Sequence, residues 1–281
     1  MSARQAALCR ISSPDFNLAL TLGSGQAFHW SPQGAGYLGL VGDLPVHIEQ
    51  SGEFLLATAG SEAAVSHYFA LDHPLREIYA TFPTDPALQE ALQFCRGLRI
   101  LRQPAWECLA TFITSSMKQV AHITQMSHAI RQKFGTPVQF GTDLLHTYPS
   151  PERLAQGSEL DLRECKLGYR AKNLLGTARM ITEGKVDLVQ IASMEDDDEA
   201  RAELCRLPGV GEKVANCVLL FGYERLRSFP IDVWIERVLR ERYFARKRKV
   251  TLKRLKDFCA EHFGPYGGYA QQYLFHHART S

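Results

Sequence analysis

Hydrophobic and polar residues alternate along short segments in the first part of the chain. The alternation has a period of two in five segments, at residues 17–22, 26–30, 36–41, 46–50 and 53–58. Gly, Pro, Ser and Asp separate these segments, as turn residues do between short strands. Alternation buries one face of a strand and exposes the other. The region therefore predicts an antiparallel sheet with one covered face.

From about residue 84 onward the hydrophobic positions follow a helical period instead. One helix is predicted to begin at Pro104, and another to run from Val120 to Phe134 and to stop at Gly135. A last helix is predicted over residues 268–278. Capping residues indicate three further helix starts, at Ser150, Ser193 and Thr251. The second part of the chain is therefore predicted to be helical.

These patterns predict an α+β fold in two parts. A small N-terminal antiparallel β-sheet domain, residues 1–83, precedes an all-α region, residues 84–281. The sequence shows no internal repeat and no low-complexity linker between them.

The composition is that of a globular protein. Of 281 residues, 45% are hydrophobic and 22% charged, which excludes disordered, collagen-like and coiled-coil classes. No apolar run reaches the roughly 18 residues of a membrane helix, and the N-terminus lacks the apolar core of a secretion signal. We therefore expect a cytoplasmic protein with no membrane partner. The seven cysteines are scattered and never spaced C-x-x-C, so no disulfide framework, zinc ribbon or cysteine-held cluster is expected.

Positive charge is concentrated late in the chain. The net charge is +2, but residues 225–256 hold twelve Lys or Arg and three Asp or Glu, a net +9, which leaves −7 for the remainder. Such a segment is either a solvated basic helix or a surface for phosphate, from which Lys and Arg displace condensed counterions. Charge alone does not decide between them.

The most informative segment, residues 207–215, reads LPGVGEKVA. Gly209 and Gly211 lie between two predicted helices, where they allow a tight reversal and leave backbone N–H groups uncovered. Such amides at a helix start bind phosphate; the alternative is a helix–helix turn with glycine chosen for backbone shape only. The pattern resembles the helix-hairpin-helix motif of DNA-binding proteins.

Lys213 and Asp232 carry the candidate chemistry. Lys213 lies in the first turn of the second hairpin helix, where the positive helix end favours the free amine, the nucleophilic form of the side chain. The alternative is an exposed lysine that contacts phosphate. Asp232 follows nineteen residues later in a Pro-Ile-Asp loop. It could cap a helix, or deprotonate the lysine and stabilise a developing cation. The combination resembles the helix-hairpin-helix/Gly-Pro-Asp superfamily of base-excision DNA glycosylases.

Within that superfamily the chain resembles the 8-oxoguanine DNA glycosylase/AP lyases of bacterial type. Members with an iron–sulfur cluster carry four clustered cysteines, which are missing here, and alkylation-repair members usually lack the hairpin lysine. Besides the hairpin, four segments match this family in order: SGQAFHW at 24–30, LRILRQ at 98–103 with ECL at 107–109, LGYRA at 167–171 and GPYGGYAQ at 264–271.

The resemblance implies a role for each catalytic and base-binding residue. Lys213 would attack C1′ of the damaged nucleotide, form a Schiff base and permit β-elimination, while Asp232 would stabilise the cationic sugar. The carbonyl of Gly25 would accept the N7–H that 8-oxoguanine has and guanine lacks. Cys217 and Phe275 would sandwich the flipped base, and Gln271 would read its Watson–Crick edge. From spacing alone, Gly25 would be a strand turn, Cys217 and Phe275 core residues, and Gln271 solvent-facing.

The resemblance also implies DNA contacts, some of them altered in this chain. The implied contacts are Gly209, Gly211, Val214, Met117, Lys118, Gln119, His122, Tyr169, Arg170 and Trp234. Met117 and His122 stand where the family has an asparagine that fills the gap in the duplex and an arginine that reads the opposite cytosine. We therefore expect a weakened preference for cytosine. Trp234 replaces a phosphate-contacting histidine, and Ala278 the aspartate that supports it.

The sequence thus predicts a bifunctional DNA glycosylase/AP lyase that removes 8-oxoguanine. Its partner would be double-stranded DNA containing an oxidised purine, bound by a monomer in the cytoplasm and, in a bacterium, at the nucleoid. No cofactor or metal is expected to be required, although the resemblance implies a monovalent cation at the hairpin carbonyls. Two alternatives stay open: a glycosylase of this fold for another damaged base, and a catalytically silent DNA-binding module.

Overall fold

A computed structural model describes residues 7–116, 118–245 and 250–280. Five strands form one antiparallel sheet in the order β1-β5-β4-β3-β2. They are β1 (Leu8–Ser12), β2 (Ser31–Gln33), β3 (Gly36–Val41), β4 (Leu44–Ser51) and β5 (Phe54–Thr58). Three short helices accompany the sheet: α1 (Leu18–Gly23), α2 (Glu62–Tyr68) and α3 (Leu75–Ala80). The predicted α+β fold with an N-terminal antiparallel sheet is confirmed.

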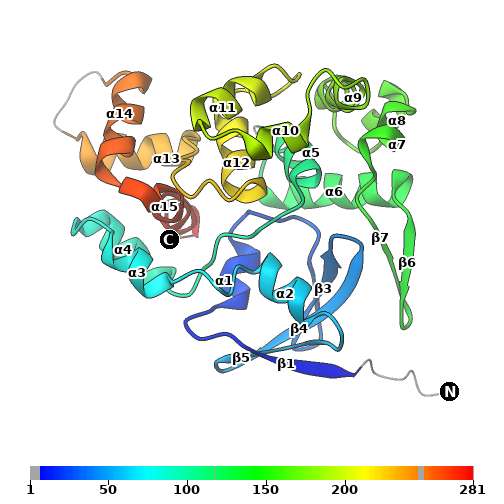
Figure 1. Ribbon diagram of the computed structural model, residues 1–281, viewed down its shortest axis with the longest axis horizontal. Coiled ribbons are helices and arrows are strands. Elements are labelled where there is room, and N and C mark those ends of the chain that lie inside the picture. The colour runs from blue at the N-terminus through cyan, green and yellow to red at the C-terminus, as the bar shows by residue number, and fades with distance from the viewer. Residues whose placement is uncertain (1–6, 117, 246–249, 281) are drawn as a thin grey trace.

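Helices dominate the rest of the chain (Figure 1). They are α4 (Pro86–Phe94), α5 (Ala105–Ser115), α6 (Val120–Phe134), α7 (Pro151–Ala155), α8 (Glu159–Glu164), α9 (Arg170–Thr182), α10 (Leu188–Ser193), α11 (Asp197–Cys205), α12 (Glu212–Gly222), α13 (Val233–Val238), α14 (Leu252–His262) and α15 (Gly267–Thr280). A π-helical turn, η1 (Leu239–Tyr243), extends α13, and a 3₁₀ turn, η2 (Gly264–Tyr266), precedes α15. No helix among these is long and apolar enough to cross a membrane.

Capping side chains set several helix starts as predicted. The hydroxyl of Ser150 accepts from the Arg153 N–H, and Thr251 caps α14 in the same way. Ser193 does not cap a helix, which corrects the prediction. Its hydroxyl bonds back to the Gln190 carbonyl, and Asp196 caps α11 instead. A carboxylate is the better acceptor at this positive helix end.

Two predicted strands are wrong. Residues 18–23 form α1, since the Asn17 side chain accepts from the Leu20 N–H and starts a helix there. Two of the alternating leucines, Leu18 and Leu22, are also one helical turn apart and lie buried with Thr21 on one helix face. Residues 26–30 are irregular because the Gln26 side chain, rather than a strand ladder, bonds the Arg99 carbonyl and the Leu101 N–H.

A hairpin of two strands, which the sequence does not predict, lies within the helical part. β6 (Pro137–Phe140) pairs with β7 (Asp143–His146). It extends beside β3 and β4 in Figure 1, and the Gln33 side chain donates to the Asp143 carboxylate over 2.8 Å. The hairpin thus ties the helices to the sheet.

Buried side chains form two groups. One lies between the sheet, α1 and α2, and the other fills the helical part around α5, whose residues from Glu107 to Ser115 are all buried. Leu75 and Ile78 of α3 belong to the helical group, whereas Leu101 belongs to the sheet group. The chain therefore crosses between the two groups more than once.

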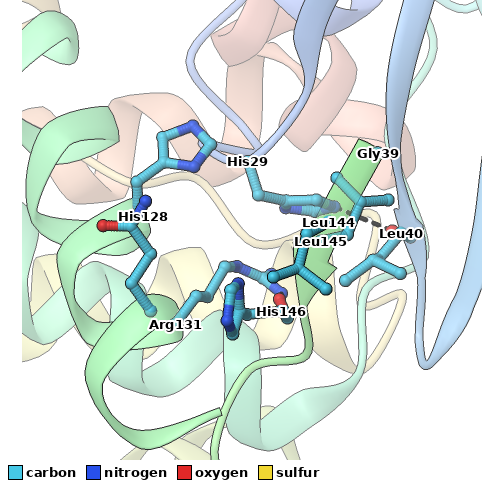
Figure 2. A pocket seen from close by; sticks show the side chains of 9 residues that line it. His29, Gly39, Leu40, His128, Arg131, Leu144, Leu145 and His146 are labelled. Carbon is cyan, nitrogen blue, oxygen red and sulfur yellow. Dashed lines mark hydrogen bonds between the residues drawn. The ribbon is translucent and has the colours of Figure 1, made fainter. Parts of the chain in front are cut away.

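Three buried polar side chains join the sheet to the helices. The carboxylate of Glu107 pairs with Arg131 of α6 and lies 3.2 Å from Nδ1 of His29, whose Nε2 is 2.8 Å from the Leu40 carbonyl. Figure 2 shows His29 directed toward Leu40 beside a cavity of about 70 Å³. Both ring nitrogens of His29 face oxygen atoms, so the ring links β3 to α5. Burial lowers the pKa of His29 and raises that of Glu107, and the charge of Arg131 opposes the rise at Glu107.

Arg131→Met should destabilise the protein by about 3–5 kcal/mol, because it leaves the buried Glu107 carboxylate without its counter-charge. The urea midpoint of unfolding measures the effect. Lys133→Met is the matched control, since Lys133 lies on the same helix but pairs with Asp161 and Glu164 near the surface. Equal midpoints for the two variants would contradict the assignment.

Candidate active site

The hairpin between α11 and α12 has the geometry that its two glycines suggest. Gly209 has φ +79°, and a Cβ there would lie 2.8 Å from the Cβ of Asn173, so only glycine fits. Gly211 has φ −101° and caps α12, with open space around it. Both glycines are exposed, whereas Val214 is buried. The turn therefore presents backbone at the surface and anchors itself through Val214.

Lys213 and Cys217 lie on one side of α12, which packs against α5. Lys213 is half-buried, with Nζ 5.2 Å from the centre of the Phe112 ring. Burial raises the pKa of the Cys217 thiol, while the charge of Lys213 and its hydrogen bond to the thiol oppose that rise. An amine is thus held against an aromatic wall beside a buried thiol.

Asp232 caps α13 and interacts with Lys213. Its carboxylate accepts from the Ile235 N–H over 2.9 Å. Burial raises the pKa of this carboxyl group, and the positive charge of Lys213 opposes the rise. Asp232 therefore caps a helix, as one interpretation of the sequence expects. It also lies near enough to Lys213 to interact with it, as the other interpretation requires. The fold brings together an amine and a carboxylate, the groups that nucleophilic attack and cation stabilisation require.

Besides Cys217 in α12, the predicted base-binding residues come from two segments that lie far apart in the sequence. Gly25 has φ +82°, and a Cβ there would lie 3.5 Å from Cε1 of Phe275 in α15. Gln271, one turn before Phe275, is only 4% exposed, and its Oε1 has no hydrogen-bond partner in the part of the chain that the structure describes. Spacing alone suggests a solvent-facing glutamine, so the structure corrects that expectation. A buried acceptor without a partner is costly unless a ligand supplies a donor.

Comparisons with known proteins agree with this arrangement. A family model described as the N-terminal domain of 8-oxoguanine DNA glycosylase matches residues 9–109. A second, described as the HhH-GPD superfamily base excision DNA repair protein, matches residues 110–261. The chain belongs to the 8-oxoguanine DNA glycosylase family of this superfamily.

Individual relatives support the same family. A probable N-glycosylase/DNA lyase of Methanothermobacter thermautotrophicus is 35% identical, over 77% of this chain and 74% of the relative. N-glycosylase/DNA lyase OGG1 of Arabidopsis thaliana is 30% identical, over 95% and 78% respectively. The solved Clostridium acetobutylicum 8-oxoguanine glycosylase/lyase, bound to double-stranded DNA with cytosine opposite 8-oxoguanine, is 32% identical. Its TM-score is 0.89, over 96% of this chain and 97% of that one.

The residues implied as DNA contacts in this glycosylase family fall into two groups. Lys118, Gln119, His122, Tyr169 and Trp234 are exposed. Arg170 is buried instead, and its Nε donates to the Ser116 carbonyl over 2.9 Å. In this structure Arg170 therefore supports the segment that leads to Lys118. Met117 lies outside the described residues.

Much of the positive charge in residues 225–256 is matched by carboxylates. Within this segment, residues 246–249 lie outside the described part of the structure. Basic side chains of the segment pair with carboxylates as follows: Arg225 with Asp197, Arg240 with Glu236, Arg242 with Glu90, Lys253 with Asp257 and Lys256 with Glu212. The described part of the segment thus favours a solvated, ion-paired surface.

Phe112 and Ser116 are site residues that the sequence does not reveal. Phe112 forms the wall beside Lys213, and Ser116 holds Arg170 through its carbonyl. In the sequence, the hydrophobic pattern around Phe112 indicates only an ordinary core position of a buried helix. Ser116 acts through its backbone, on which the side-chain pattern carries no information.

Gly209→Ala should destabilise the protein by about 1–3 kcal/mol, because an L residue is strained at this φ and its Cβ meets Asn173. Gly211→Ala, with ordinary φ and open space, should leave the urea midpoint close to that of the wild type. Similar midpoints for both variants would refute the assignment of backbone strain to Gly209.

Asp232→Asn should slow base release by about 10²–10⁴-fold while sparing DNA binding, since asparagine still caps α13. The raised pKa means that the carboxylate is lost at a higher pH than an exposed aspartate would lose it. The wild-type single-turnover rate should therefore fall as pH drops through that pKa, and the variant should lack this fall. Asp257→Asn, which breaks an exposed pair, is the control. If the single-turnover rate of Asp232→Asn still falls as pH drops, the fall belongs to another titratable group.

Proposed function

We propose that the protein is a bifunctional glycosylase/lyase that excises 8-oxoguanine from double-stranded DNA and then cleaves the strand. The single observation that carries the proposal is a half-buried lysine, Lys213, held against Phe112 on the helix that follows the hairpin, with the helix-capping carboxylate of Asp232 near it. A silent DNA-binding module needs the hairpin amides, but it does not need a half-buried carboxylate close to a lysine. The family and the Clostridium acetobutylicum relative support the choice of base.

The chemistry follows from the two groups. The Nζ lone pair of Lys213 attacks C1′, the C1′–N9 bond breaks, and the base leaves with its bonding electrons and is protonated. Opening of the sugar ring gives a Schiff base between C1′ and Nζ. Loss of a C2′ proton then expels the 3′ phosphate and cleaves the strand. The Asp232 carboxylate stabilises the positive charge that develops on the sugar.

Recognition of the base rests on Gly25, Gln271, Cys217 and Phe275. The Gly25 carbonyl would accept the N7–H of 8-oxoguanine, and guanine would leave this carbonyl unpaired. The unpartnered Oε1 of Gln271 would accept an N–H of the Watson–Crick edge. Cys217 and Phe275 would contact the two faces of the flipped base.

Contacts with the duplex are assigned to the exposed backbone at Gly209 and Gly211 and to two exposed groups of side chains. One group is Lys118, Gln119 and His122, and the other is Tyr169 and Trp234. His122, together with Met117, would weaken the preference for cytosine opposite the lesion. The enzyme would act as a monomer in the cytoplasm, at the nucleoid in a bacterium, where its substrate lies.

No organic cofactor enters this reaction, and we assign a monovalent cation to the hairpin carbonyls. The carbonyls of Leu207 and Pro208 accept from the Val210 N–H and the Thr177 hydroxyl. Each keeps a second lone pair for a cation. Among the described residues, no group of three His, Cys, Asp or Glu side chains is placed to hold a metal ion.

Lys213→Gln should abolish base release and strand cleavage while sparing DNA binding, because glutamine has no nucleophilic amine. Borohydride trapping on a duplex with one 8-oxoguanine measures this: wild type should give a covalent adduct and the variant none. Repeating the assay with each base opposite the lesion tests the weakened preference for cytosine. Tight binding by wild type without an adduct would instead favour another lesion or a silent module.

A further inference from the structure

Arg279, near the end of α15, contacts both sides of the predicted base pocket. We propose that Arg279 is a positioning residue that fixes the Gly25 carbonyl relative to Phe275 and thereby sets the selectivity for 8-oxoguanine. This inference rests on the proposed function of the site, and no sequence motif discussed above includes Arg279.

Arg279 links the loop after α1 to the last helix. Its Nη2 donates to the Gly23 carbonyl over 2.6 Å. Its Nη1 lies 3.8 Å from the position that a Cβ on Gly25 would take, and its Cζ lies 5.5 Å from the centre of the Phe275 ring. One guanidinium thus contacts the segment that presents the Gly25 carbonyl and the ring that would stack on the base.

Two consecutive carbonyls of this segment are held by α15. The Gly23 carbonyl accepts from Arg279, and the Ser24 carbonyl accepts from Nε2 of Gln272 over 2.9 Å. The next carbonyl, that of Gly25, accepts no hydrogen bond from any described residue. Because peptide units are planar, holding the Ser24 carbonyl also holds the N–Cα bond of Gly25, so the φ and ψ angles of Gly25 then set the direction of its carbonyl. Gly25 has a left-handed φ that glycine adopts easily but does not enforce.

The shape of the Arg279 side chain suits this position. The fork of the planar guanidinium allows one side chain to bond a carbonyl while lying on a ring, which a lysine does less well.

Two DNA substrates distinguish a role of Arg279 in positioning the base pocket from a role in folding. Excision of 8-oxoguanine needs both the base pocket and Lys213, whereas cleavage at a preformed abasic site needs Lys213 without the base pocket. Single-turnover rates on both duplexes would be measured for wild type, Arg279→Met and Arg279→Lys. Arg76→Met serves as the control, because Arg76 makes an exposed ion pair with Asp15 far along the chain from α15.

We expect Arg279→Met to slow 8-oxoguanine excision by between about 10- and 100-fold, with abasic-site cleavage within about twofold of wild type. Arg279→Lys should recover part of the loss, and Arg76→Met should match wild type on both duplexes. In a Lys213→Gln background, Arg279→Met should also reduce the preference in binding for an 8-oxoguanine duplex over a guanine duplex.

Three results would overturn the proposal. Equal losses on the two duplexes would assign Arg279 a role in folding only. Unchanged excision in Arg279→Met would remove any role in the pocket. If the wild-type protein cleaves abasic sites but releases no 8-oxoguanine, the proposed substrate is refuted. The role of Arg279 in positioning the pocket for that base is then refuted as well.

Discussion

The predicted base pocket depends on hydrogen bonds between the beginning and the end of the chain. The carbonyls of Gly23 and Ser24 accept from Arg279 and Gln272, partners that lie about 250 positions later in the sequence. In Figure 1, α1 lies next to α15, although the two helices are at opposite ends of the colour scale. Lys213 and Asp232, the proposed catalytic pair, both lie in the helical part. The proposed base pocket also needs Gly25, which lies in the part of the chain that holds the sheet.

Local chemistry predicts many of the elements. Ser150 and Thr251 start helices because their hydroxyls replace missing backbone acceptors, and this depends on neighbours within three residues. The segment 17–22 fails because its leucines satisfy both a strand and a helix period, and Asn17 decides between them. The strands β6 and β7 escape prediction because much of what holds them, such as the contact between Gln33 and Asp143, is distant in sequence.

The candidate site is predictable to a different extent. Spacing places Lys213 and Cys217 on one helix face, and the glycines of the hairpin reveal its turn. The sequence separation of Asp232 and Lys213 does not predict that they lie close together, because the path of the intervening loop decides where α13 begins. That pairing was predicted from the family resemblance. Neither source reveals that Arg170 is buried against the Ser116 carbonyl. The ion pairs of the basic segment are equally hidden from the sequence, since partners such as Glu90 for Arg242 come from remote elements.

The order of the elements along the chain, with α15 after the others, has a consequence for synthesis. A protein emerges from the ribosome N-terminus first, and its early segments can begin to fold before the rest exists. Here the sheet, the hairpin, Lys213 and Asp232 all precede α15. The partners of the Gly23 and Ser24 carbonyls lie in α15 and are therefore made after all of these elements. A nascent chain that has not reached α15 would carry Lys213, the proposed nucleophile, without the residues proposed to hold the base pocket. Under the proposed function, synthesis of α15 is therefore the step that would complete base discrimination.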